Sequence, residues 1–595
     1  MKRYGHPVLT QLRALRWVTM GHKGGALKAV LVLLLAFVAQ AQPLRSLKEV
    51  PVPEPPGLDS YVRDRTALVT LGKAFFWDMQ AGSDGRTACA TCHFHAGGDH
   101  RGQNQLADPN NPFPANYTLA AESFPFRLLA DPADRNSTVL RDTTMRAGSA
   151  GLFRRMFTDV QPGFAAEKGE AAFDAPEFMI GPLMVRRVTK RNSPTVINSV
   201  FHVRNFWDGR AQRIFNGFTP EGASGDPPGA LVVRDGVLGR EPVRLDNSSL
   251  ASQAVGPALD HLEMSYAGRS WPKMGKKMLS LRPLALQRVA PDDSVLGTLR
   301  VSDRGLYEPV TYVTLIQTAF QRRLWESPQL VDESGNTLAG RMMEPSGTAE
   351  FTQAEFNFSL FWGLALLAYQ STLVSYDSPF DRAMEGRAEA LTAQEREGMQ
   401  IFQTTGRCTT CHGGAEFTAA SFSAQSTRGN RAFTRTGVRP PTEDAGAGNA
   451  SFKTSALRNI EFSGPYFHNG GQATLEQVAD LYARAGDFGN NQLRSFRIDN
   501  SQRSALVAFL KALTDDRVRF ERAPFDHPEL CVPAGHYPEA GDSPLTAAEK
   551  WVALPAVGAA GNLAPLRTFD ELLRGIGGDG SRSHALTEVC TIPLP

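Results

Sequence analysis

Two short stretches decide the fold of this chain: Cys89-Ala90-Thr91-Cys92-His93 and Cys408-Thr409-Thr410-Cys411-His412. Each is a Cys-x-x-Cys-His motif, the attachment signature of c-type haem. Its two thiols add to the vinyl groups of one porphyrin, and the adjacent imidazole is then placed to bind the iron. A zinc site would need further ligands at comparable spacing, and a redox-active cysteine pair would not need the histidine. Two copies therefore predict two covalently bound haem c groups, with His93 and His412 as iron ligands.

The surroundings of the two motifs form an internal repeat. Gly and Phe recur at the same interval before each motif, in Leu71–Phe76 and in Glu397–Phe402. Each motif is therefore expected to follow a helix, and the start of the second helix is marked by a capping box of Thr392 and Glu395. A later part of each half repeats as well: Asn198 precedes Phe206-Trp207-Asp208-Gly209 at the same offset at which Asn459 precedes Phe467-His468-Asn469-Gly470. The repeat predicts a mainly α-helical protein with two cytochrome c-like haem domains.

Length, composition and charge exclude several classes of protein. The 595 residues correspond to roughly four domain-sized units, and a hydrophobic content of 42% suits ordinary globular cores. The formal charge is only +2, and no long block of Lys or Arg is available to bind a phosphate backbone. We therefore expect a globular protein that does not bind nucleic acid.

The N-terminus indicates the compartment. Basic residues up to Lys28 precede the apolar run Ala29–Val38 and the small-x-small pattern Ala39-Gln40-Ala41. This is typical of a signal peptide cleaved near Ala41, and so of a periplasmic or otherwise exported protein. A membrane anchor is the alternative, although the run is shorter than the roughly 20 apolar residues that a spanning helix needs. In an oxidising compartment the remaining Cys531 and Cys590 could form a disulfide, and the sequence leaves their pairing open.

Several motifs, in order, carry a family resemblance: Leu71-Gly72-Lys73 through His93, Arg191–Pro194, Phe206–Arg210 and Gly464–Gly470. They resemble the di-haem cytochrome c peroxidases, whose superfamily also holds the enzyme that matures the tryptophylquinone of methylamine dehydrogenase. The resemblance covers most of residues 65–105, 185–265 and 350–520. It implies domains at 42–385 (peroxide-reactive haem, with insertions) and 386–523 (electron-transfer haem), followed by an extension at 524–595.

The same resemblance assigns a peroxide pocket to Gln253-Ala254-Val255-Gly256-Pro257 and Glu263-Met264. Glu263 is the candidate base that moves a proton between the two peroxide oxygens, and Gln253 is the candidate hydrogen-bond donor. A solvated surface glutamate is the alternative. Ordinary members carry a removable distal histidine before Asn192, but Gly181–Lys190 contains none. A vacant sixth position on the first iron is therefore expected.

Two further histidines lie near this pocket in sequence. His261 could be an iron ligand, a second proton carrier or a residue that packs the loop. His95 is too close to His93 to reach the opposite face of the same ring, so it is expected in the second shell or on the surface.

The resemblance places Tyr482 as the distal ligand of the second haem and Trp207 between the two haems, where it can relay an electron. The alternative for each residue is a packing role: Tyr482 would point into a core, and Trp207 would be a buried aromatic residue. Oxygen ligation would favour ferric iron and a lower potential than Met/His ligation. The resemblance also implies a calcium ion bound by the side chain of Asn192 and the carbonyls of Ser463 and Pro465, since hard oxygen ligands suit that ion.

The leading functional hypothesis is reduction of hydrogen peroxide with electrons from a small donor protein such as cytochrome c or a cupredoxin. The alternatives are oxidative modification of a partner protein, haem-dependent oxygenation of a bulky substrate, and simple electron transfer. Long segments exceed the minimal family form and could shape access to the first haem: 101–190, 216–247, 265–348 and 524–595.

Overall fold

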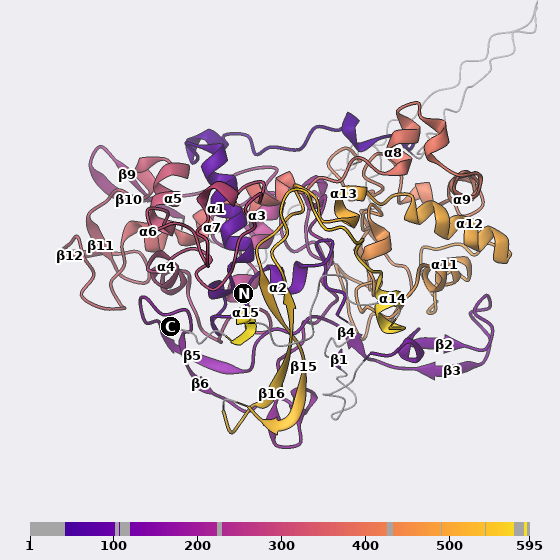
Figure 1. Ribbon diagram of the computed structural model, residues 1–595, viewed down its shortest axis with the longest axis horizontal. Coiled ribbons are helices and arrows are strands. Elements are labelled where there is room, and N and C mark those ends of the chain that lie inside the picture. Colours follow the sequence, from indigo (N-terminus) through magenta and orange to yellow (C-terminus); the bar gives the residue numbers. More distant parts are fainter. Residues whose placement is uncertain are drawn as a thin grey trace, which may run out of the picture. The chain divides into compact units, whose positions relative to one another are not determined.

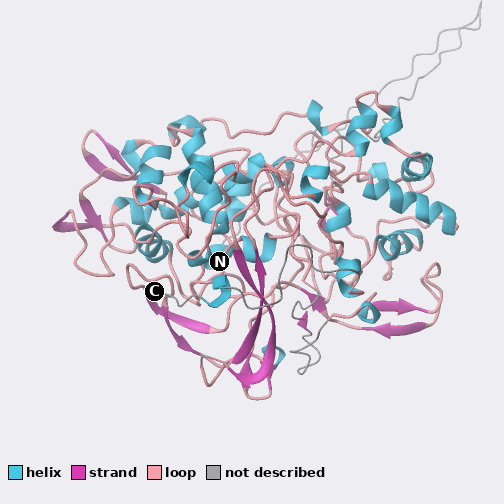
Figure 2. Ribbon diagram, in the orientation of Figure 1, coloured by secondary structure: helices cyan, strands magenta, loops and turns pink. Residues whose placement is uncertain are grey.

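The computed structural model describes residues 42–101, 106–107, 119–222, 229–424, 432–489, 491–541, 543–575 and 588–591. The expected signal peptide, residues 1–41, lies outside them. Helices and irregular loops dominate the described chain (Figures 1 and 2). The helices are α1 (Arg65–Trp77), α2 (Ala90–His93), α3 (Ser249–Ala254), α4 (Trp271–Leu279), α5 (Tyr312–Ala319), α6 (Gln353–Phe356), α7 (Phe358–Thr372), α8 (Pro379–Met384), α9 (Ala393–Gln403), α11 (Leu475–Ala483), α12 (Asn500–Lys511), α13 (Asp516–Arg519), α14 (Phe569–Leu573) and α15 (Glu588–Thr591).

The strands form antiparallel pairs and no larger sheet within the described residues. The pairs are β1 (Leu106–Ala107) with β4 (Arg146–Ala147), β2 (Arg127–Leu129) with β3 (Val139–Asp142), β5 (Arg155–Asp159) with β6 (Lys168–Ala171), β7 (Met179–Ile180) with β8 (Leu183–Met184), β9 (Ala230–Arg234) with β10 (Val237–Glu241), β11 (Gln329–Val331) with β12 (Thr337–Met342), β13 (Phe433–Thr434) with β14 (Phe452–Lys453), and β15 (Leu530–Ala540) with β16 (Ala547–Leu554). The prediction of a mainly α-helical fold is confirmed.

Two helix pairs repeat the same close contact. In the first half α1 packs on α7, and a Cβ added to Gly72 would lie 2.0 Å from the carbonyl oxygen of Ala365. In the second half α9 packs on α12, and a Cβ added to Gly398 would lie 1.9 Å from the carbonyl oxygen of Ala505. Glycine therefore recurs before each Cys-x-x-Cys-His motif because the helix backbones touch there.

The loops after the motifs repeat in the same way. Asn198 and Asn459 both adopt the left-handed conformation, with φ of 61° and 58°, and each precedes a 3₁₀ turn. The side-chain oxygen of Asn198 accepts the N–H of Ser375, and that of Asn459 accepts the N–H of Asp515. Asparagine tolerates this conformation because its short side chain bonds to nearby backbone. The internal repeat predicted from the sequence is thus present in the backbone.

Local signals account for where most helices begin. Asp64 caps α1 by accepting the N–H of Ala67, and the predicted capping box of Thr392 with Glu395 begins α9. Thr474 likewise caps α11, where Gln477 accepts the N–H of Ala473 and no capping box forms.

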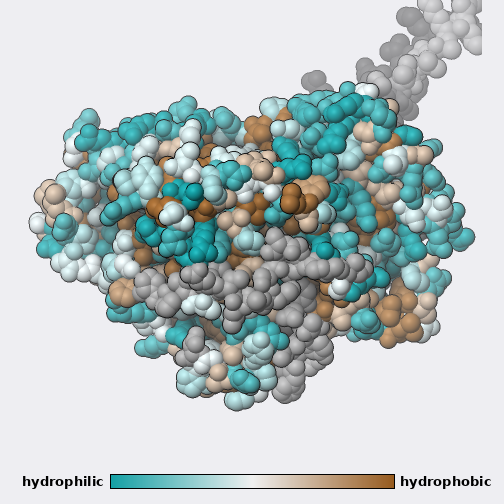
Figure 3. Space-filling model, in the orientation of Figure 1, coloured by the Kyte–Doolittle hydropathy of each residue, from teal (hydrophilic) through white to brown (hydrophobic). Residues whose placement is uncertain are grey.

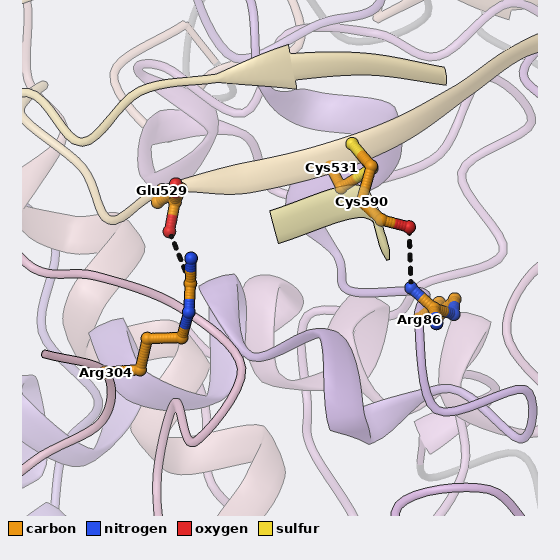
Figure 4. Close-up of a disulfide and its surroundings, with 5 residues drawn as sticks. All are labelled: Arg86, Arg304, Glu529, Cys531 and Cys590. Atoms are coloured by element: carbon orange, nitrogen blue, oxygen red, sulfur yellow. Dashed lines mark hydrogen bonds and ion pairs between the residues drawn. A yellow bond between two sulfur atoms is a disulfide. The ribbon is translucent and has the colours of Figure 1, made fainter. Parts of the chain in front are cut away.

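The C-terminal extension returns to the first half of the chain. Strand β15 packs against α2, and Arg101 donates to the carbonyl of Pro533 in β15. Cys531 and Cys590 form a disulfide with a Cα–Cα distance of 5.4 Å (Figure 4). Arg86, close to the first haem motif, donates to the carbonyl of Cys590 over 3.2 Å. The disulfide that the sequence left open is therefore present. It holds α15 close to Arg86 and so to the first motif.

The described surface in Figure 3 is largely hydrophilic, with scattered apolar residues. Across the described ranges, no helix combines the length and apolar character required to cross a membrane.

Candidate active site

The first haem motif is presented by a short helix. Cys89 caps α2, which carries Cys92 and ends at His93. The Nδ1 atom of His93 lies 2.9 Å from the carbonyl oxygen of Gly97. With Nδ1 donating to that carbonyl, Nε2 remains for iron, which is the usual arrangement of a metal-binding histidine. Burial also lowers the pKa of His93, which favours the neutral ring that can bind a metal.

The second motif repeats this geometry. Cys408 begins a 3₁₀ turn, and Nδ1 of His412 lies 3.1 Å from the carbonyl oxygen of Phe417. Cys408, Cys411, Cys89 and Cys92 form no disulfide within the described residues. Both motifs therefore offer two thiols and an oriented imidazole, the donor set that haem c requires.

Glu263 lies beside the first motif. Its carboxylate acts electrostatically on the thiols of both Cys89 and Cys92. The pKa of Glu263 is raised to about 7, mainly by burial and also by the nearby Asp260, while Arg210 opposes the shift. A carboxyl group that titrates near neutral pH at a cofactor site is suited to acid–base catalysis. The side chain is half-buried, so the alternative of a fully solvated surface glutamate is not what the structure shows.

A buried ionic cluster holds the loop that carries Glu263. Arg269 donates to the carbonyls of Ala258 and Met264, on either side of Glu263, and pairs with Glu167 over 2.6 Å. Lys277 pairs with the same Glu167 carboxylate over 2.7 Å, and all three charged side chains are fully buried. Charges removed from water in this way are tolerated only when they are paired and hydrogen-bonded. The cluster therefore sets the path of the loop.

The loop also has a close backbone neighbour. A Cβ added to Gly151 would lie 1.8 Å from the carbonyl oxygen of Leu262 and 3.1 Å from that of Glu263. No other residue fits at position 151 without moving the loop.

Gln253 and Pro257 flank the start of this loop. Gln253 is half-buried near the end of α3, and Pro257 begins a 3₁₀ turn over Pro257–Leu259. Among the described residues, no hydrogen bond joins Gln253 to Glu263. Gln253 and Glu263 thus come from one continuous segment, without a hydrogen bond between them in the described structure.

The two remaining histidines differ in placement. The side chain of His261 is 52% exposed and lies 3.6 Å from Asp260, which does not fit a residue that packs the loop. His95 is fully buried, and its ring stacks on that of His100 with centroids 3.2 Å apart. His95 is therefore not a surface residue, because the loop after α2 folds back over it.

Trp207 connects segments of the two halves. Its indole N–H donates to the carbonyl of Asn192 over 2.8 Å, and its own carbonyl accepts from the N–H of Lys453 over 2.7 Å. The ring also lies edge-on to His468 with centroids 6.4 Å apart. The residue thus touches chain from both repeats.

Tyr482 lies at the second motif. Burial raises its pKa, and the thiols of Cys411 and Cys408 contribute to that rise. Within the described residues, no hydrogen bond occupies its hydroxyl. Tyr482 is therefore placed near the two thiols, with an oxygen available for a ligand.

The residues expected to bind calcium lie together. The amide group of Asn192 is within hydrogen-bond reach of the Pro465 carbonyl, and the buried Oδ1 of Asn192 has no hydrogen-bond partner among the described residues. A buried oxygen without a partner beside a carbonyl is the donor chemistry that a hard cation needs. Asn192 and Pro465 therefore fit the ion, with Ser463 two residues before Pro465.

Sequence reasoning missed Glu167, Arg269 and Lys277. They come from segments without a recognisable pattern, and scattered charged residues are ordinarily solvated. Arg210, which acts on Glu263, was visible only as the last residue of the Phe-Trp-Asp-Gly-Arg motif.

A family model described as di-haem cytochrome c peroxidase matches residues 165–389. The matched range includes Trp207, Gln253 and Glu263, and both Cys-x-x-Cys-His motifs lie outside it.

Two curated relatives illustrate the similarity. The methylamine utilization protein MauG of Methylorubrum extorquens is 34% identical over 152 residues, 25% of this chain and 42% of that protein. The cytochrome c551 peroxidase of Nitrosomonas europaea is 36% identical over 170 residues, 26% of this chain and 45% of that protein. The chain thus spans about half the length of these relatives. A solved structure of a MauG-like protein associated with microbial copper homeostasis superposes with a TM-score of 0.42 at 16% sequence identity. The superposition covers 81% of this chain and 95% of that protein's chain.

Proposed function

We propose that this chain, which belongs to the di-haem cytochrome c peroxidase family, is an oxidoreductase that reduces hydrogen peroxide at its N-terminal haem site. Electrons would come through the C-terminal haem from a small donor protein such as cytochrome c or a cupredoxin. The observation that carries the proposal is Glu263, a carboxyl group with a pKa of about 7 beside the first pair of haem-binding thiols.

Reduction of hydrogen peroxide consumes two electrons and two protons and yields two waters. Haem c, when bound, supplies the iron that binds peroxide and exchanges electrons. Glu263 accepts a proton from one peroxide oxygen and returns it to the other, and at neutral pH both of its protonation states are populated. The Arg269–Glu167 pair keeps the loop in place, and Trp207 lies where an electron can pass between the two halves.

The rest of the arrangement follows from the same assignment. The peroxide-reactive haem domain would span residues 42–385, the electron-transfer haem domain 386–523 and the extension 524–595. Asn192, Ser463 and Pro465 would hold a calcium ion between the two, and the protein would be exported after cleavage near Ala41.

A second candidate function is oxidative modification of a partner protein. It is favoured by Tyr482 beside Cys408 and Cys411, since an oxygen ligand stabilises the oxidised iron. It is also favoured by the absence of histidine from Gly181–Lys190, which predicts a first haem that reacts with peroxide without prior reduction.

The test compares three reactions of the two-haem protein: peroxide with reduced cytochrome c, peroxide alone, and oxygen alone. Donor oxidation that requires peroxide supports the peroxidase, whereas turnover with oxygen alone contradicts it. The mass of the denatured protein should show two haems per chain, and a single haem would exclude the two-site assignment.

A further inference from the structure

A second tryptophan lies beside the first haem site. Trp77 is the last residue of α1 and lines the same cavity as His93, together with Tyr369, Glu521 and His527. The intervening ring is Phe76, whose centroid is 6.4 Å from that of His93 and 5.8 Å from that of Trp77. Trp77 is therefore separated from the iron-binding imidazole by one aromatic side chain.

The indole of Trp77 is held rigidly. It stacks on the imidazole of His527 with centroids 4.6 Å apart and an interplanar angle of 11°. Its N–H donates to the hydroxyl of Tyr369 over 2.9 Å, and all three side chains are buried. The partner of the N–H is thus a neutral hydroxyl and not a carboxylate.

A buried charged cluster with more carboxylates than ammonium groups acts on Tyr369, the hydrogen-bond partner of Trp77. Lys73 lies 2.8 Å from Asp293 and 3.0 Å from Asp526, and the three side chains are fully buried. Both carboxylates act on Tyr369, where they add to the effect of burial in raising its pKa. The Oδ2 atom of Asp293 has no hydrogen-bond partner among the described residues.

A further carboxylate lies at the stacked imidazole. Glu521 lies 3.5 Å from Nε2 of His527 and accepts a hydrogen bond from Asn562. The buried cluster of Lys73, Asp293 and Asp526 by itself carries a formal charge of −1.

This environment favours loss of an electron from Trp77. Tryptophan and tyrosine are the side chains most readily oxidised by one electron. In a low-dielectric interior a nearby negative charge strongly stabilises a cation, and a stacked ring adds polarisable surface. Because the N–H donates to a hydroxyl that is a weak base, the oxidised indole keeps its proton. Loss of the electron is then reversible without proton transfer.

We propose that Trp77 is a reversible one-electron donor to the first haem site, where it stores one oxidising equivalent as a radical cation when peroxide arrives before the donor protein. This rests on the proposed peroxidase function. Hydrogen peroxide takes two electrons, one from Trp77 and one from the haem iron, and two protons from solvent. No proton leaves the indole, and one electron from the donor protein later restores it.

The test is electron paramagnetic resonance of the two-haem protein, frozen within milliseconds of mixing with one equivalent of peroxide and no donor. The wild type should show an organic radical that narrows when the protein is made with ring-deuterated tryptophan. Trp77→Phe should lose this signal. Trp362→Phe should keep it, as a matched control whose buried indole donates to Ala254 over 3.0 Å outside the cavity.

The outcomes separate this inference from the proposed function. If peroxide is consumed but no tryptophan radical forms, or if the signal survives in Trp77→Phe, Trp77 does not store the equivalent. If the wild type does not consume peroxide, the peroxidase function itself is overturned. The deuterated wild-type protein tests for a tryptophan radical even if Trp77→Phe fails to fold.

Discussion

The indole N–H of Trp207 donates to the backbone carbonyl of Asn192 over 2.8 Å. Asn192 in turn donates its backbone N–H to the carbonyl of His468, in the second repeat, over 2.8 Å. A side chain from the first repeat is thereby fixed to a segment that is bonded to the second.

We expect Trp207→Phe to slow electron transfer between the two haems while both remain bound. The phenyl ring fills less of the space between the segments and leaves the Asn192 carbonyl without its donor, a loss of about 1 kcal/mol in stability. Stopped-flow reduction of the two haems measures the transfer. Trp325→Phe is the control, since that half-buried indole donates to Phe320 in the first half. Equal transfer rates in Trp207→Phe and wild type would exclude the relay role.

Glu263→Gln should slow the reaction with peroxide by at least about tenfold, the lower end of what general acid–base catalysis contributes. The wild-type rate should also rise as the pH increases through about 7, because the protonated carboxyl group that predominates below this pKa cannot accept a proton. The glutamine variant should lack this rise.

Single-turnover mixing with peroxide at several pH values measures both effects. Glu170→Gln, on the exposed strand β6, is the control and should behave as wild type. A wild-type rate that does not change between pH 6 and pH 8, around the pKa of about 7, would remove Glu263 from its assigned role.

Gly151→Ala should displace the Glu263 loop. The new methyl group would lie 1.8 Å from the Leu262 carbonyl, and overpacking of this kind costs about 1–3 kcal/mol. We therefore expect a lower thermal midpoint together with slower reaction with peroxide. Gly239→Ala is the matched control, because a Cβ there meets nothing within 4 Å. A destabilised variant with an unchanged peroxide rate would show that the loop position does not control the chemistry.

Tyr482→Phe should leave the second haem five-coordinate, and Tyr482→His should keep it six-coordinate with a higher reduction potential. The reason is that an anionic oxygen ligand favours ferric iron more than a nitrogen ligand does. Optical spectra and a potentiometric titration report the two quantities. If the phenylalanine variant keeps the wild-type spectrum, another group is the ligand and Tyr482 only packs in the core.

Much of the fold could be predicted because its signals are local. The haem motifs, the glycines of α1 and α9 and the repeated Asn198 and Asn459 turns each depend on contacts that a short stretch of sequence encodes. Helix caps are similarly local. Gln477 shows their limit, since its side chain accepts the N–H of Ala473 and not that of the N-cap residue Thr474.

Features built from remote segments could not be predicted. The cluster of Glu167, Arg269 and Lys277 joins residues about a hundred positions apart, and no sequence pattern distinguishes these charges from solvated ones. The sequence left His95 either in the second shell or on the surface, and it could not show that the loop after α2 covers this residue and buries it. The Cys531–Cys590 pairing likewise depends on where the end of the chain returns.

That return has a consequence for biogenesis. Strand β15, which packs on α2, follows it by more than four hundred residues in the chain and is therefore synthesised later. Cys89 and Cys92 must react with haem while α2 is still accessible to the attachment machinery. We therefore expect haem attachment to precede the packing of β15 on α2 and the formation of the Cys531–Cys590 bond.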